Sequence, residues 1–239
     1  MNLLAVNSDA KTRKGSAKGY LTGILYLVPS DGSGLGNLCP NASAGRRAAC
    51  LYTAGRGVMK PVQAGRMRKT KLFFDNAALF VDILALDIAR LVKRAHKADM
   101  VPCVRLNGTS DIPWERIKGT DGRTLMDRFP GVQFYDYTKR PDRTTGYANY
   151  HLTFSLSETN GPQALLELAR GRNVAVVFDT KRGHTLPTSW LGFTVVDGDE
   201  SDLRFLDVPM YGPGLVIGLR AKGKAKGEAS GFVQIAEVA

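Results

Sequence analysis

The sequence has no apolar run long enough to cross a membrane. No stretch approaches the roughly 20 apolar residues that a transmembrane helix needs. Residues 1–19 open on a short apolar segment without a following hydrophobic core, so no signal peptide is expected either. Three cysteines among 239 residues are too few, and an odd number, for a disulfide framework. These absences predict a cytoplasmic protein, because the cytoplasm keeps thiols reduced.

Several motifs of known chemistry are also missing. The Gly-Lys-Ser/Thr ending of a phosphate-binding loop does not occur, which argues against ATP hydrolysis of that type. The Gly-x-Ser-x-Gly elbow of serine hydrolases is absent, and no helix-turn-helix or zinc finger can be defended. The three histidines, His96, His151 and His184, lack the spacing of metal ligands.

Positive charge is what the chain has in excess. Thirty-three Lys and Arg face twenty-two Asp and Glu, a net charge of +11. Such a surplus favours a polyanionic partner, because each phosphate that is neutralised releases counterions. Nucleic acid is therefore the expected partner, DNA rather than RNA. The alternative is a basic surface that only faces solvent.

Short apolar runs alternate with helical segments along the chain. Strands are predicted at 20–28, 101–106, 132–137, 150–156, 173–178, 192–196 and 214–219, and helices at 75–97 and 162–171. This pattern predicts a single α/β domain over 1–239 whose mostly parallel sheet forms a partial or distorted barrel. A basic flexible N-terminal arm (about 7–19) and a basic C-terminal loop (about 220–228) complete the predicted domain.

The predicted helix at 75–97 has two different faces. Leu79, Ile83, Leu86 and either Arg90 or Leu91 follow helical spacing and predict an apolar face. Basic side chains form the predicted polar face near the end of this helix; they are Arg90, Lys93, Arg94 and Lys97.

Polar side chains follow nearly every predicted strand. In parallel α/β folds the carboxyl ends of the strands share one edge, which is where ligands bind. The candidate acid–base or catalytic carboxylates at these ends are Asp111, Asp136, Glu158 and Asp179. The candidate phosphate or base ligands are Arg105, Asn107, Lys139, Lys181, Arg182, Lys222 and Lys224. The alternative is that these acids only neutralise neighbouring Lys and Arg.

One segment combines glycines with dense positive charge. Thr53-Ala-Gly-Arg-Gly57 allows backbone amides to approach an anion, and Arg56 offers bidentate contacts to phosphate oxygens. The basic side chains that follow are Lys60, Arg66, Arg68, Lys69 and Lys71. This segment is the preferred nucleic-acid contact.

The loop Cys39-Pro-Asn-Ala-Ser-Ala-Gly-Arg-Arg-Ala-Ala-Cys50, with the Thr-Ala-Gly-Arg-Gly that follows, resembles a bacteriophage family called the gene-product-88 family. The likeness continues through residues 105–115, 134–139 and 152–158, and so covers most of the chain. The family-like loop would carry three cysteines, spaced to hold a metal or an iron–sulfur cluster.

This sequence departs from the family-like loop at its middle cysteine. Arg46 stands at that position, which leaves Cys39 and Cys50 as candidate ligands for iron–sulfur or zinc. Two thiolates do not make a site by themselves, and Cys103 lies at an apolar strand position where core packing is expected. The alternative is a structural loop held by packing.

Two functional hypotheses follow. The first is a phage-type nucleic-acid-associated protein that binds phosphates and holds a nucleotide or base in a polar pocket at the strand ends. Aromatics such as Phe134, Tyr135, Tyr147 and Tyr150 could stack on bases there; the alternative, which is the more common role of such side chains, is core packing. The second is an enzyme derived from a cluster-bearing partial barrel, similar to radical S-adenosylmethionine enzymes, acting on a nucleotide or small molecule. A structural or partner-binding protein is a third possibility.

Overall fold

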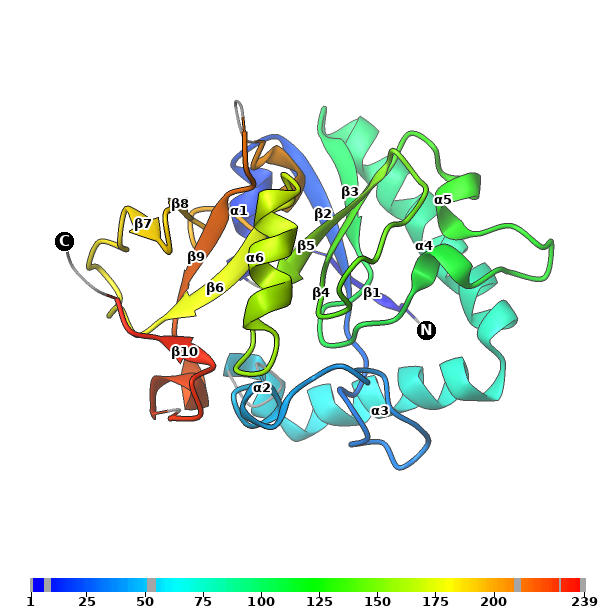
Figure 1. Ribbon diagram of the computed structural model, residues 1–239. Coiled ribbons are helices and arrows are strands. Elements are labelled where there is room, and N and C mark those ends of the chain that lie inside the picture. Colours follow the sequence, from blue (N-terminus) through cyan, green and yellow to red (C-terminus); the bar gives the residue numbers. More distant parts are fainter. Residues whose placement is uncertain (1, 7–9, 51–54, 209–211, 228, 237–239) are drawn as a thin grey trace. The chain divides into compact units, whose positions relative to one another are not determined.

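The computed structural model describes residues 2–6, 10–50, 55–208, 212–227 and 229–236, and in them the chain has an α/β fold (Figure 1). The chain divides into two compact units. Unit 1 comprises residues 1–40, 59–136 and 144–151, and unit 2 comprises residues 41–58, 137–143 and 152–239. The single domain expected from the sequence stays a prediction.

Ten strands are formed by the described residues. They are β1 (Leu4–Val6), β2 (Tyr20–Leu25), β3 (Val101–Arg105), β4 (Gln133–Thr138), β5 (Tyr150–Ser155), β6 (Val174–Phe178), β7 (Ser189–Trp190), β8 (Phe193–Asp197), β9 (Val216–Arg220) and β10 (Val233–Gln234). The α-helices are α1 (Ala10–Ser16), α2 (Ala44–Ala48), α3 (Lys60–Asp75), α4 (Ala77–Lys97), α5 (Leu125–Arg128) and α6 (Gly161–Ala169). Short 3-10 turns include η2 (Gly55–Val58) and η5 (Gly223–Gly227).

Unit 1 has the strand order β1-β2-β3-β4. β2, β3 and the start of β4 are parallel, and β1 pairs antiparallel with β2 at the edge. Helix α4 packs against β2 and β3 and covers their apolar side chains. β2 and β3 read as near-continuous apolar runs because their side chains are buried almost throughout.

Unit 2 has the order β5-β6-β9-β8-β7, with β10 beside β6. Pairs β5–β6, β6–β9, β8–β9 and β10–β6 are parallel, and only the short β7–β8 pair is antiparallel. Helix α6 packs on β6, and its Ala164 and Leu168 join the buried core of this unit.

The predicted α/β class and mostly parallel sheet are therefore confirmed. The strand order starts at β1 and ends at β7 without returning to its start, so the sheet is open and not closed into a barrel. All seven predicted strands are present within one to three residues of their expected bounds, and so are the two predicted helices.

Three segments differ from the expectation. Residues 10–16, expected in a flexible arm, form α1, which packs against β2 with Thr12 fully buried. Residues 223–227, expected in a loop, form η5. The basic segment after residue 59 forms the 16-residue helix α3, which starts with Pro in its first turn.

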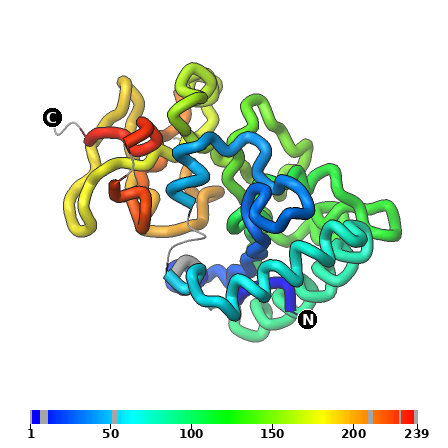
Figure 2. The backbone as a smooth tube through the Cα atoms, turned by 90° about the horizontal axis from the view of Figure 1, so that it is seen from below, coloured from blue at the N-terminus to red at the C-terminus, as the bar shows by residue number. Residues whose placement is uncertain are grey.

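Helices α3 and α4 meet at a corner (Figure 1). Asn76 is their junction: its extended backbone ends α3, and its side chain caps α4 by accepting a hydrogen bond from the Leu79 N–H. Figure 2, seen from below, shows α3 along its length, with the N-terminal strand passing close to it. Lys69 of α3 donates to the Leu3 carbonyl at that point.

The buried face of α4 matches the expected one only in part: Leu91 is buried and Ile83 is half-buried. Phe80, Leu84 and Ile88 are fully buried, whereas Leu79 and Leu86 are 43% and 59% exposed. The helix carries apolar residues on more than one face, so spacing alone did not identify the core side.

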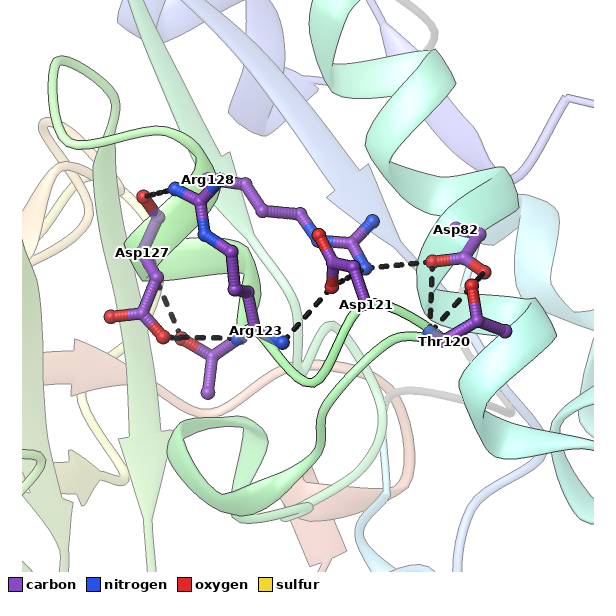
Figure 3. A network of polar contacts seen from close by, with 7 residues as sticks. Asp82, Thr120, Asp121, Arg123, Asp127 and Arg128 are labelled. Atoms are coloured by element: carbon purple, nitrogen blue, oxygen red, sulfur yellow. Dashed lines mark hydrogen bonds and ion pairs between the residues drawn. The ribbon is translucent and has the colours of Figure 1, made fainter.

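A polar clasp ties the loop before α5 to α4 (Figure 3). The Asp82 carboxylate accepts hydrogen bonds from the N–H and hydroxyl of Thr120 and from Arg128, which also pairs with Asp121. The pKa of Asp82 is lowered, first by the Thr120 hydroxyl and then by Arg128. The pKa of Asp121 is lowered by the Arg123 N–H and by Arg128.

The clasp makes stability depend on acid pH. A carboxylate with a lowered folded-state pKa stabilises the fold above its unfolded pKa, about 3.9 for Asp, and this contribution is lost as the pH falls through the folded value. We expect Asp82→Asn to lower the urea midpoint at pH 6 but much less at pH 3. Asp31→Asn, at an exposed aspartate without a side-chain hydrogen bond among the described residues, is the control. An Asp82→Asn deficit that is equal at both pH values would contradict the clasp.

Candidate nucleic-acid interface

Asp136 of β4 is completely buried at the strand end of unit 1. One carboxylate oxygen accepts from the Asn107 N–H at 2.7 Å, and the other from the Tyr150 hydroxyl at 2.8 Å. The Arg105 Nε lies 4.0 Å away and supplies the compensating charge. A buried carboxylate needs such partners, because its desolvation is otherwise too costly.

Asn107, which follows β3, also uses its side chain in hydrogen bonds within the protein. Its side-chain oxygen accepts from the Ser110 hydroxyl, the Ile112 N–H and the Trp114 indole, and its amide donates to the Ile112 carbonyl. These bonds fold residues 107–114 into a closed turn that buries Trp114. Asp111 lies in the same turn, 1% exposed, with its N–H donated to Leu38.

The structure thus brings together Arg105, Asn107 and Asp136, and it does so as a buried support for the loop. The aromatics considered for base stacking are mostly core, in agreement with the alternative of core packing: Phe134 and Tyr135 are fully buried and Tyr150 nearly so. Asp111 and Asp136 belong to unit 1, whereas Glu158 and Asp179 belong to unit 2. Their meeting in one catalytic basin stays a prediction.

Removing the Asp136 carboxylate should destabilise the protein. Asp136→Ala leaves Arg105 and several donors buried without their acceptor, and we expect it to lower the free energy of unfolding by about 3–5 kcal/mol. Tyr150→Phe removes one hydrogen bond to a charged group and should cost about 1.5–3 kcal/mol. Urea denaturation followed by circular dichroism measures both. A stable Asp136→Ala variant would contradict the structural role.

Glu158 in unit 2 is bound to the start of α2. Its carboxylate accepts from the Ser43 hydroxyl and the Gly45 N–H, both at 2.7 Å. Ser43 also caps α2 through the Arg46 N–H. Gly45 is required here, because a Cβ would lie 2.0 Å from the Ser230 hydroxyl and 3.0 Å from Glu158. Glu158 therefore anchors the cysteine-containing loop.

Arg46, at the position of the family-like middle cysteine, contacts two neighbouring side chains of unit 2. It donates to the Ser155 hydroxyl at 2.6 Å, and its guanidinium lies over the Phe232 ring at 4.9 Å. These contacts supply packing and a hydrogen bond to the loop, the roles of a structural residue.

The candidate metal ligands Cys39 and Cys50 belong to different units. Cys39 is buried and donates its thiol to the Thr109 carbonyl, and Cys50 is half-buried. Among the residues that the structure describes, no group of three or more His, Cys, Asp or Glu is placed to hold a metal. With a guanidinium at position 46, the donor set needed for iron–sulfur or zinc is incomplete.

The Glu158 anchor can be tested by removing it. Glu158→Ala takes away both acceptors at the start of α2, and we expect the free energy of unfolding to fall by about 1–2 kcal/mol. Glu158→Gln keeps one oxygen acceptor and should lose less. The matched control is Glu200→Ala, an exposed acid in the same unit. Equal stability of Glu158→Ala and the control, measured by thermal denaturation, would refute the anchor.

Among the remaining strand-end residues of unit 2, some form ion pairs with each other and others are exposed to solvent. Lys222 and Arg220 bind the Asp199 carboxylate, and Arg220 also pairs with Asp197. Burial raises the pKa of Asp199, but the hydrogen bonds from Lys222 and Arg220 outweigh it and lower the pKa overall. Asp179 is exposed and accepts from the Ala236 N–H. Lys181, Arg182 and Lys224 are exposed, and Lys139 is half-buried.

The buried face of α3 is held by polar side chains. Arg66 lies over the Tyr26 ring at 5.0 Å, and the Thr70 hydroxyl accepts from the Val28 N–H. Lys69 donates to the Leu3 carbonyl at 2.6 Å. Burial lowers the pKa of Lys69. The nearby positive charge of Arg66 lowers this pKa further, whereas the negative charge of Asp87 raises it but does not cancel the shift. Arg66 and Lys69, two of the predicted phosphate ligands, therefore orient the helix.

The opposite face of α3 keeps the other predicted ligands in solvent. Lys60 and Arg68 are exposed and make no ion pair among the described residues, while Lys71 pairs with Asp75 one turn away. Arg56, in η2 of unit 2, is also exposed. Residues 53 and 54, at the start of the glycine-containing segment, lie outside the described residues.

Charge is unevenly distributed over the two units. Unit 1 has 18 Lys and Arg against 11 Asp and Glu, a net +7, and unit 2 has 15 against 11, a net +4. Helices α3 and α4 alone carry nine basic residues and three acids, a net +6. Nearly all the excess of unit 1 thus lies on two consecutive helices.

Sequence reasoning did not include the end of α4 among the candidate ligands. Its basic residues are all exposed; they are Arg90, Lys93, Arg94 and Lys97. Lys93, Arg94 and Lys97 follow Arg90 at distances of three, four and seven positions, which places all four on one face of the helix. From the sequence, this face was interpreted as a polar face and not as a ligand site.

No helix among the described residues is long and apolar enough to span a membrane. Taken together, the fold and surface define an α/β protein with an open, mostly parallel sheet and a basic helical pair. The chain belongs to the Gene product 88 family, whose model matches residues 1–235. No curated protein and no solved structure matches the chain.

Proposed function

We propose that this phage-family protein binds nucleic acid through the phosphate backbone, with exposed basic residues of α3 as contact points. The observation that carries the proposal is that some basic side chains of α3 face the protein and others face solvent. Arg66 and Lys69 hold the helix in place, which leaves Lys60 and Arg68 directed to solvent without an acidic partner among the described residues. Exposed cations on a fixed helix are preorganised for phosphate contacts.

The polar strand-end pocket receives less support than the helix surface. Asn107 and Asp136 use their polar atoms on each other and on the loop that follows β3, so a base placed there would compete with buried hydrogen bonds. The cluster-bearing enzyme hypothesis gains no specific observation, because the cysteine loop lacks a complete donor set. The proposal is therefore confined to phosphate binding.

We place this activity in the host-cell cytoplasm and favour DNA as the partner. Cys39, Cys50 and Cys103 are free thiols, the state that a reducing compartment maintains. The net charge of +11 favours a polyanion such as nucleic acid.

Removing the two exposed charges of α3 that form no ion pair among the described residues should weaken binding. We expect Lys60→Gln/Arg68→Gln to lower the affinity for a labelled 24-base-pair DNA about tenfold or more at 50 mM salt, because two phosphate contacts are lost. Fluorescence anisotropy provides the affinity. The matched control is Arg116→Gln/Lys118→Gln, which removes two exposed charges from the same unit. Equal effects of both pairs would count against a site on α3.

A further inference from the structure

The last two turns of α4 form a continuous basic surface. Arg90, Lys93, Arg94 and Lys97 project from one face at positions i, i+3, i+4 and i+7, and all four are exposed. We call this set the α4 cation stripe. With a rise of 1.5 Å per residue it is about 10 Å long.

Two acids flank the stripe in the sequence. Asp87 is buried and accepts from the N–H groups of Leu3 and Leu4 and from Arg90. Asp99, two residues after Lys97, is exposed and forms no ion pair among the described residues. Arg90 stays 64% exposed in its pair with Asp87, so its guanidinium is both held in place and accessible. Among the described residues, Lys93, Arg94 and Lys97 form no ion pair.

The local field is positive. The carboxyl end of a helix carries about half a negative charge, which favours cations in its last turn, and Asp87 offsets the charge of Arg90. The remaining like charges repel one another, and a bound anion would relieve that repulsion.

The geometry points to double-stranded DNA as the ligand of the α4 cation stripe. Each strand of a duplex carries one phosphate per about 3.4 Å of the duplex axis, so a stripe of about 10 Å that lies parallel to this axis spans the rise of about three base pairs. A helix also fits the width of the DNA major groove, which is about 12 Å. This inference rests on the proposed nucleic-acid binding. It adds a second contact surface to that on α3, and it adds a preference for double-stranded over single-stranded nucleic acid.

Single-stranded nucleic acid suits this surface less well. Proteins that bind single strands combine a basic groove with exposed aromatic rings on which the bases stack. The stripe contains no aromatic residue, and Phe74 on α3 is the one exposed aromatic in the described part of the chain. Phosphate contact without stacking is typical of duplex binding that does not depend on sequence.

The test compares two charge-matched variants of the full chain. Lys93→Gln/Arg94→Gln removes the centre of the stripe, and Arg116→Gln/Lys118→Gln removes two exposed charges elsewhere in unit 1. Anisotropy titrations use a 24-base-pair DNA, one of its single strands, and a duplex RNA of the same sequence, between 50 and 200 mM salt. Thermal denaturation confirms that both variants are folded.

We expect the wild type to bind the DNA duplex more tightly than the single strand or the RNA. Lys93→Gln/Arg94→Gln should lower duplex affinity about tenfold or more at 50 mM salt and reduce the slope of log K against log salt by about 2. The control should change the affinity less than twofold.

Equal losses in both variants, or tighter binding of the single strand or the RNA, would overturn the inference. If Lys60→Gln/Arg68→Gln weakens binding while Lys93→Gln/Arg94→Gln does not, the stripe is excluded and the proposed function stands. If the wild type binds none of the three nucleic acids at 50 mM salt, both proposals fail.

Discussion

The buried carboxylate of Asp136 holds the ends of two neighbouring strands of unit 1 together. It binds the backbone and side chain of Asn107 after β3, the Tyr150 hydroxyl and, more loosely, Arg105. Asn107 in turn closes the loop over Trp114, which packs against Phe73 of α3 and Phe80 of α4. The position of the basic helices in this unit thus depends on a polar network in its core.

Much of the fold could be predicted from the sequence. The parallel strands are continuous apolar runs and α4 is long and periodic, so local pattern was sufficient for both. Helix α3 gave no such signal, because Arg66 and Thr70 are its buried side chains. The core face of α4 was misjudged in part because the helix carries two apolar patterns. Leu79 and Leu86 repeat with helical spacing on an exposed face, and Phe80, Leu84 and Ile88 do so on the buried face.

The candidate site was predictable only in part. Residue type correctly identified basic and polar positions, but burial decides which of them are available. Arg105, Asn107 and Asp136 depend on contacts between residues about 30 positions apart, which sequence spacing does not reveal. Lys60 and Arg68 remain in solvent because Arg66 and Lys69, their neighbours in sequence, face inward. The basic spacing of the α4 cation stripe was visible in the sequence, but only the structure shows that all four side chains are exposed.

The central claim is that the excess positive charge binds nucleic-acid phosphates. The most direct measurement is the affinity of the wild-type protein for a 24-base-pair DNA at several salt concentrations between 50 and 200 mM. We expect measurable binding at 50 mM and a linear fall of log K with log salt, with a slope of about −3.6 or steeper, since at least four cations would contact phosphates. A slope near zero, or no binding at 50 mM, would contradict it.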